Sequence, residues 1–116
     1  MSRTQLMKGL VVAIALSCPA SLAYAQDEAQ VKKGQEVYAA QKCSVCHAIA
    51  GKGSKTNPLD GVGKKLSADD IRSWITHPKD AAAKAKSTKK PPMPDKYGKL
   101  PAADLDALVA YMQSLK

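Results

Sequence analysis

The chain has few of the large side chains from which a small protein usually builds its core. It contains no phenylalanine and one tryptophan, and aromatic residues make up 4% of its 116 residues. A domain of this size buries a small share of its surface on folding and often depends on a disulfide, a metal or another stabilising group. The composition therefore argues against a self-sufficient apolar core and predicts that a bound group fills part of the interior.

Cysteine is also scarce, and its spacing excludes a stabilising disulfide framework. Of the three cysteines, Cys18 lies in the apolar N-terminal stretch, and Cys43 and Cys46 are close neighbours in the chain. A disulfide stabilises a protein mainly by closing a long loop in the unfolded chain, so a bridge between Cys43 and Cys46 would contribute little. The group that stabilises the domain is therefore expected to be something other than a disulfide.

No apolar run is long enough to cross a bilayer, which takes about 20 residues. Residues 9–16 are continuously apolar, with Arg3 and Lys8 before them and a small-x-small sequence at residues 23–25 after them. A basic start, a short apolar run and a small-x-small site are typical of a secretory signal peptide. We therefore expect cleavage after Ala25.

This signal divides the chain into residues 1–25, which we expect to be removed, and residues 26–116, which we expect to form one periplasmic domain. Two other interpretations of the apolar run remain open. It could be a buried helix of the domain, or a lipoprotein signal ending at Cys18, although residues 15–17 fit the lipoprotein pattern poorly. No repeat, linker or second apolar run indicates another domain.

Hydrophobic residues recur at helical spacing in three segments, and no segment alternates with the two-residue period of a strand. The expected helices span residues 31–40, residues 67–76 and residues 101–115. Residues 51–65 are rich in glycine and are expected to form a loop. Residues 80–90 are rich in alanine and lysine, which allows one or two helical turns. We therefore expect an all-α domain of three or four helices.

Single residues mark details of these helices. Ser67 is placed to cap the amide of Asp70 at a helix start, and the pair His77 and Pro78 is expected to end that helix. Gly34 lies inside the first expected helix, where glycine costs about 1 kcal/mol relative to alanine. Gly34 is either tolerated there or required by the close approach of another helix.

Residues 43–47 read Cys-Ser-Val-Cys-His, the C-x-x-C-H pattern by which c-type haem is attached. Two thiols on one turn can each add to one vinyl group of the porphyrin. His47 then lies under the iron, where its imidazole becomes an axial ligand. One haem attached covalently at Cys43 and Cys46 would also be the bound group that the composition requires, because it is a large apolar plate.

Two other chemistries use closely spaced cysteines. A thioredoxin-like redox pair is expected beside a β-α-β unit, and the chain shows no such pattern. A structural zinc site needs four ligands. With His47 and His77 the chain reaches four on paper, but their spacing resembles no common zinc module. Haem attachment is therefore the preferred interpretation.

The second axial position of the iron has three candidate ligands. Met112 falls on the apolar stripe of the last expected helix and is typical of core packing. His77 is typical of a solvated helix end. Met93 lies outside any helical pattern, in a Pro-Pro-Met-Pro sequence whose prolines stiffen the loop. We expect Met93 to be the ligand.

The C-x-x-C-H motif, the Pro-Pro-Met-Pro segment and the sequence LDALVAYMQSL at residues 105–115 together resemble the small bacterial class I cytochromes c. The resemblance covers residues 31–116 and implies three or four helices around one covalent haem with histidine and methionine ligands. It implies that Gly34 and Tyr111 meet where the first and last helices cross. It also implies that Trp74 lines the haem pocket on the methionine side.

The same resemblance identifies Pro58 and Leu59 as pocket residues in a turn that follows the haem-binding segment. The family usually has a proline two positions before this leucine, and the carbonyl of that proline accepts a hydrogen bond from the histidine ligand. Here Asn57 holds that place. The sequence therefore leaves open which carbonyl orients His47.

An iron with two protein ligands suits one-electron transfer, and the sequence marks out no catalytic pair of residues. We therefore expect a periplasmic electron carrier and not an enzyme. Two alternatives stay open. One is a haem subunit or dedicated electron donor of a particular oxidoreductase, and the other is a ligand-binding haem sensor whose methionine dissociates.

Basic residues outnumber acidic ones, and the formal net charge is +8. Lysines gather on both sides of Met93, namely Lys79, Lys84, Lys86, Lys89, Lys90, Lys96 and Lys99. Such a patch would attract acidic docking surfaces of redox partners and speed association, or it could serve solubility alone. Because the chain is expected to be exported and no aromatic residue is interleaved with the lysines before Met93, we expect no nucleic-acid binding. We expect a monomer with at most peripheral membrane contact.

Overall fold

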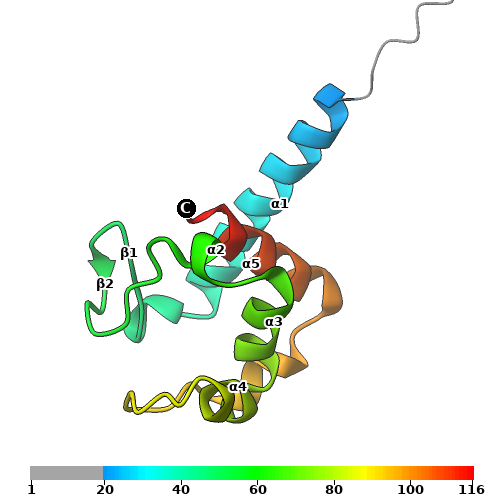
Figure 1. Ribbon diagram of the computed structural model, residues 1–116. Helices are drawn as coiled ribbons and strands as arrows, with labels where there is room; N and C mark the ends of the chain where they lie inside the picture. The colour runs from blue at the N-terminus through cyan, green and yellow to red at the C-terminus, as the bar shows by residue number, and fades with distance from the viewer. Residues whose placement is uncertain (1–19) are drawn as a thin grey trace, which may run out of the picture.

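The computed structural model describes residues 20–116 of the chain. Its elements in chain order are the helix α1 (Ala20–Ala40), the 3-10 turn η1 (Cys43–Val45), the strands β1 (Ala48–Ile49) and β2 (Lys52–Gly53), the helices α2 (Val62–Lys65), α3 (Ala68–Thr76) and α4 (Pro78–Lys84), the 3-10 turn η2 (Asp95–Lys99) and the helix α5 (Ala102–Ser114). The all-α prediction is confirmed, with one small hairpin added (Figure 1). No helix within this range combines the length and apolar character needed to cross a membrane.

The long helix α1 begins before the expected helix of residues 31–40. Residues 20–30 contain no glycine or proline that would end a helix. The apolar run of the expected signal peptide lies outside the described residues, and the expected cleavage site after Ala25 falls within α1. Whether the chain is cut there stays a prediction.

Helices α1 and α5 pack across each other (Figure 1). A Cβ atom at Gly34 would stand 2.6 Å from the Cβ of Tyr111 and would overlap the carbonyl oxygen of Ala107. The rings of Tyr38 and Tyr111 meet edge to face beside this crossing, with centroids 5.7 Å apart. The structure thus confirms that Gly34 is required by a close approach of helices.

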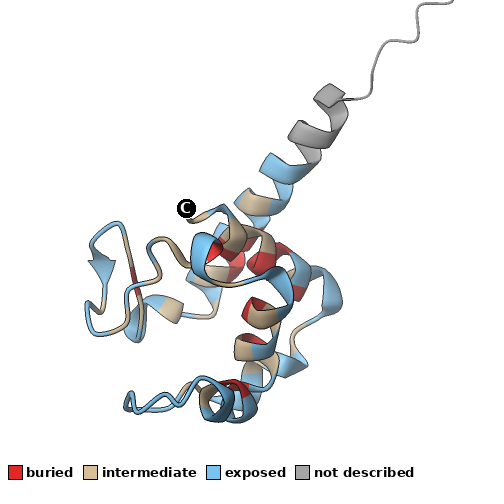
Figure 2. Cartoon of the chain, viewed as in Figure 1, coloured by how far each residue is buried: buried red, intermediate tan, exposed pale blue. Residues whose placement is uncertain are grey.

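Buried residues lie mainly on α5 and on the parts of α1 and α3 that pack against it (Figure 2). They form one cluster of Val37, Ile71, Ile75, Leu105, Leu108, Val109 and Met112. The cluster confirms the predicted apolar faces of the second and last helices. Among the described residues no large side chain is completely buried, so the protein core is small, as the composition predicts.

The helix α3 begins and ends where the sequence predicts. The Ser67 hydroxyl accepts a hydrogen bond from the Asp70 amide at 3.1 Å, and His77 separates α3 from α4. The helical turns expected within residues 80–90 occur slightly earlier, because α4 starts at Pro78. Proline is favoured in the first turn of a helix, where its missing N–H is no loss.

The expected loop of residues 51–65 contains more regular structure than predicted. β1 and β2 pair as an antiparallel hairpin, with Ala48 opposite Gly53. Between the strands, Ala50 and Gly51 adopt φ angles of 51° and 79°. Tight hairpin turns require such positive angles, so the loop prediction was wrong for this part of the chain.

Helix α2 also lies within the expected loop, and contacts with the C-terminal end of α5 hold it. The Gly63 amide donates to the Leu115 carbonyl at 2.8 Å, and the Lys116 ammonium donates to the Gly63 carbonyl at 3.0 Å. The Gln113 side chain donates to the Leu66 carbonyl at 3.1 Å. These partners are distant in sequence, so the local glycine content could not predict this helix.

Candidate functional site

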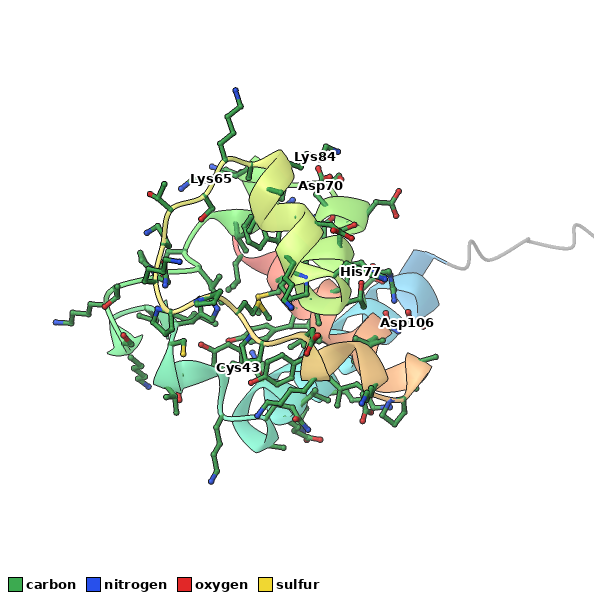
Figure 3. All side chains as sticks on the ribbon, turned by 90° about the horizontal axis from the view of Figure 1, so that it is seen from below. Cys43, Lys65, Asp70, His77, Lys84 and Asp106 are labelled. Carbon is green, nitrogen blue, oxygen red and sulfur yellow. The ribbon has the colours of Figure 1, made fainter. Side chains whose placement is uncertain are left out.

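The turn that follows α1 holds two thiols and an imidazole at neighbouring positions. Lys42 adopts a left-handed φ of 56° and ends the helical path. The amides of Cys46 and His47 then both donate to the Cys43 carbonyl, at 3.2 and 3.0 Å. Cys43 is half-buried, Cys46 is exposed, and the two form no disulfide; Figure 3 labels Cys43 on this turn. The structure thus brings the three residues of the C-x-x-C-H motif onto one tight turn.

The turn η2 lies beside these cysteines. Burial is the main cause that raises the pKa of the Cys43 thiol, and the positive charge of Lys96 opposes it. Burial also raises the pKa of Tyr97, with further contributions from Cys43 and Cys46. The Lys96 ammonium lies over the Tyr97 ring, 5.2 Å from its centroid. The charge of Lys96 and the ring of Tyr97 therefore act on the cysteine turn from the segment that follows Met93.

The His47 imidazole is half-buried, and one backbone carbonyl holds it. Its Nδ1 lies 3.0 Å from the carbonyl oxygen of Asn57. Because a carbonyl can only accept, Nδ1 is the donor in this hydrogen bond, which leaves Nε2 as the nitrogen available to a metal. A metal-ligating imidazole needs this tautomer and this kind of orienting hydrogen bond. The carbonyl that the sequence left open therefore belongs to Asn57.

The three candidate pocket residues differ in their surroundings. Leu59 and Trp74 are half-buried, and Leu59 packs against the edge of the core cluster. Pro58 is exposed, but its backbone forms a β-bridge with Ala48. Pro58 thus meets the protein residues of the site through its main chain.

The three candidates for the second axial ligand also lie apart. Met112 is 6% exposed and belongs to the core cluster. His77 is exposed at the junction of α3 and α4 (Figure 3), and its Nδ1 lies 2.8 Å from the Thr76 hydroxyl. Met93 is half-buried between α4 and η2, at the edge of the core. Of the two methionines among these candidates, Met93 is the one that lies on a loop and not inside a helix.

Two contacts around the site were not anticipated from the sequence. The Asp60 carboxylate accepts a hydrogen bond from the Ala50 amide at 2.8 Å, and the Thr56 carbonyl accepts one from the Lys89 ammonium at 3.3 Å. Each tie connects segments that are distant along the chain, and no local motif marks either one. Asp60 stabilises the strained Ala50 backbone of the hairpin.

The described residues give no support to the two other cysteine chemistries. Within them no three His, Cys, Asp or Glu side chains come together as a metal site would need, whereas a structural zinc site uses four ligands. Their sheet is a two-stranded antiparallel hairpin and not the β-α-β unit of a thioredoxin-like redox pair.

The comparison with known families agrees with the haem motif. A family model described as Cytochrome c matches residues 31–116. This chain belongs to the cytochrome c family. No curated protein and no solved structure matches it. Membership implies the all-α cytochrome c fold and a covalently bound haem c, and it indicates haem-based electron transfer.

The residues of this cytochrome c fit a haem. Two neighbouring thiols could form the thioether links, and the unpaired Nε2 of His47 could bind iron. Half-buried apolar side chains that border the core cluster could contact the porphyrin, namely Leu59, Val62, Leu66, Met93, Tyr97 and Leu100. Donor chemistry and apolar lining therefore agree with the cofactor that the family carries.

Proposed function

We propose that this cytochrome c is exported to the periplasm and shuttles single electrons between redox proteins. Its haem is joined to Cys43 and Cys46, and His47 and Met93 are the axial ligands. One observation carries the assignment of His47 as a ligand. The Asn57 carbonyl accepts from the His47 Nδ1–H, which leaves Nε2 for iron, and His47 lies on the same turn as the two thiols.

The groups around the site suit electron transfer better than catalysis. A bound haem c supplies a one-electron redox couple, and histidine with methionine as ligands raises its reduction potential. The Asn57 carbonyl fixes the imidazole of His47, and the Met93 thioether favours reduced iron. Because both axial positions are held by the protein, small molecules are kept from the iron. This favours a carrier over a sensor or an enzyme.

A basic surface around Met93 would guide the partners. The exposed lysines on α4, on η2 and between them are Lys79, Lys84, Lys86, Lys89, Lys90, Lys96 and Lys99. Val45, between the two cysteines, is 71% exposed and offers an apolar contact. Positive charge speeds association without demanding tight binding. We therefore infer a monomeric carrier whose redox partners present acidic docking surfaces.

Export is tested separately from electron transfer. Residues 1–25 have the composition of a cleaved signal, so the periplasmic protein is expected to begin at Gln26. N-terminal sequencing of the haem-loaded protein from a periplasmic extract checks this. An uncut chain retained in the cytoplasm would contradict the localisation.

The docking proposal is tested by reversing charge on the basic surface. We expect Lys84→Glu with Lys86→Glu to slow electron exchange with an acidic redox protein and to reduce its dependence on ionic strength. Lys64→Glu with Lys65→Glu, on α2, makes the same charge change elsewhere and serves as the control. Equal slowing by both pairs would show that net charge acts, and not a docking surface.

Two measurements distinguish the carrier from its alternatives. A free carrier stays monomeric in gel filtration with candidate partners, whereas a permanent stoichiometric complex would indicate a subunit. A carrier with a firmly held Met93 does not bind carbon monoxide in the ferrous state at neutral pH. Rapid binding would favour the sensor.

A further inference from the structure

The carbonyl oxygen of Asn57 receives two donors from the cysteine turn. His47 Nδ1 donates at 3.0 Å and the Ala48 amide at 3.4 Å. The Leu59 amide donates back to the Ala48 carbonyl at 2.8 Å, and Ala48 and Pro58 form a parallel β-bridge. The segment from Asn57 to Leu59 thus runs beside the histidine like a short additional strand, and it determines where the acceptor of the imidazole lies.

Pro58 restricts the residue that supplies this carbonyl. A proline disfavours helical backbone angles at the residue before it, because the proline Cδ clashes with that residue's N–H and Cβ. The ψ angle of Asn57 decides where the Asn57 carbonyl points, so Pro58 limits the rotation of that carbonyl. Pro58 itself is exposed, and its ring does not belong to the core cluster.

We propose that Pro58 is a positioning residue for His47. By restricting the ψ angle of Asn57, it keeps the Asn57 carbonyl on Nδ1 and so sets how strongly the imidazole donates electrons to iron. At the other end of the segment, the tie between Asp60 and the Ala50 amide at 2.8 Å fixes the backbone. Pro58 acts at the opposite end of this segment, next to the Asn57 carbonyl that accepts from His47. The inference rests on the proposed role of His47 as an iron ligand.

The reduction potential is expected to report this role. A hydrogen bond from Nδ1–H to a carbonyl makes the imidazole a more basic ligand, and a more basic ligand favours ferric iron. When the Asn57 carbonyl can turn away, the ferric state loses that support, and the reduction potential rises. The loss of buried packing would lower the free energy of unfolding without requiring this shift.

The test compares Pro58→Ala with one matched variant in the haem-loaded protein. Pro101→Ala removes another exposed proline that follows an extended residue, Leu100, far along the chain from His47. A pyridine haemochrome assay first shows that each variant carries haem. Exchange of the His47 Nδ1 proton is then followed by NMR, and the reduction potential is measured by titration.

We expect Pro58→Ala to exchange the His47 Nδ1 proton roughly fivefold faster than the wild type, as the loss of an ordinary hydrogen bond implies, and to show a higher potential. The control variant Pro101→Ala is expected to match the wild type. If Pro58→Ala and Pro101→Ala give the same exchange rate and potential, the positioning role is overturned.

The outcome separates this inference from the proposed function. If the wild-type His47 resonances lack the shifts of an iron-bound imidazole, His47 is not a ligand and both proposals fall. If His47 is bound and Pro58→Ala behaves as the wild type, the positioning role alone falls. If the Pro58→Ala shifts occur but the docking variants have no effect, the docking proposal alone falls.

Discussion

Lys89 and Thr56, 33 positions apart, are joined by a hydrogen bond of 3.3 Å from the Lys89 ammonium to the Thr56 carbonyl. Thr56 directly precedes Asn57, whose carbonyl holds His47, and Lys89 lies shortly before Met93. One contact therefore connects the loop that holds His47 in place with the loop that carries Met93. It would hold the methionine loop near the histidine side of the site.

Removing this contact is expected to free the methionine loop. We predict that Lys89→Ala binds added imidazole at the ferric iron about two- to fivefold faster, because one ordinary hydrogen bond no longer opposes release of Met93. Stopped-flow absorbance measures the rate. Lys84→Ala removes the same charge from α4, and its rate should stay at the wild-type value. Equal acceleration in both variants would point to charge and not to the Thr56 contact.

Replacing Met93 or Met112 with alanine is expected to affect different properties, the haem spectrum in one case and the stability in the other. Met93→Ala should keep its covalent haem but lose the methionine–iron(III) absorption band and bind exogenous ligands. Met112, 6% exposed in the core cluster, should keep the band when changed to alanine and lose about 2–5 kcal/mol of unfolding free energy. Visible spectra and urea unfolding separate the two effects. A Met93→Ala spectrum that keeps the band would show that Met93 is misassigned.

The α1–α5 crossing tolerates no side chain at Gly34. Gly34→Ala would overlap the Ala107 carbonyl and crowd the Tyr111 Cβ. We expect it to lower the free energy of unfolding by about 1–3 kcal/mol, as overpacking does. Gln35→Ala, exposed on the same helix, should change it by no more than about 0.5 kcal/mol. Urea unfolding of the haem-loaded variants checks both values, and a neutral Gly34→Ala would rule out the close packing of the two helices.

The Tyr38 hydroxyl is buried and has no hydrogen-bond partner within residues 20–116, which the structure describes. An unsatisfied buried hydroxyl costs about 1–3 kcal/mol, so Tyr38→Phe should raise the free energy of unfolding at neutral pH. Burial, with smaller contributions from Cys43 and Tyr111, raises the pKa of Tyr38 to about 12. The unfolded chain releases this proton near pH 10.

The raised pKa of Tyr38 determines how the free energy of unfolding changes with pH. The folded protein holds the Tyr38 proton more tightly, so its contribution to stability is complete below about pH 10. It is lost as the pH rises from about 10 toward 12. The advantage of Tyr38→Phe should therefore grow across this range in urea unfolding at several pH values. An advantage that stays constant would contradict burial of the hydroxyl.

The features that the sequence predicted correctly depend on local or periodic patterns. The Ser67 cap and the helix break at His77 arise within a few residues, and the apolar stripes of α3 and α5 follow the helical repeat. The Gly34 crossing was reached by family resemblance, because a glycine inside a helix alone allows two explanations. The structure decides between them through Ala107 and Tyr111.

The features that could not be predicted depend on contacts between distant segments. Helix α2 lies in a glycine-rich stretch, and main-chain bonding of Gly63 to Leu115 holds it. The acceptor for His47 is a backbone carbonyl. Every residue type has this group, so the side chain at a position does not reveal that its carbonyl is the acceptor. Its identity follows from the strand-like pairing of Ala48 with Pro58, which no motif records.

The central claim is that one haem is joined to the chain through Cys43 and Cys46 and completes its interior. The most direct measurement is a pyridine haemochrome spectrum with an intact mass of the protein, produced in a host that matures c-type cytochromes. The account predicts one haem held by two thioethers, and a haem-free, largely unfolded chain when Cys43→Ala and Cys46→Ala are combined. A colourless wild-type protein that is nevertheless compact and helical would contradict it.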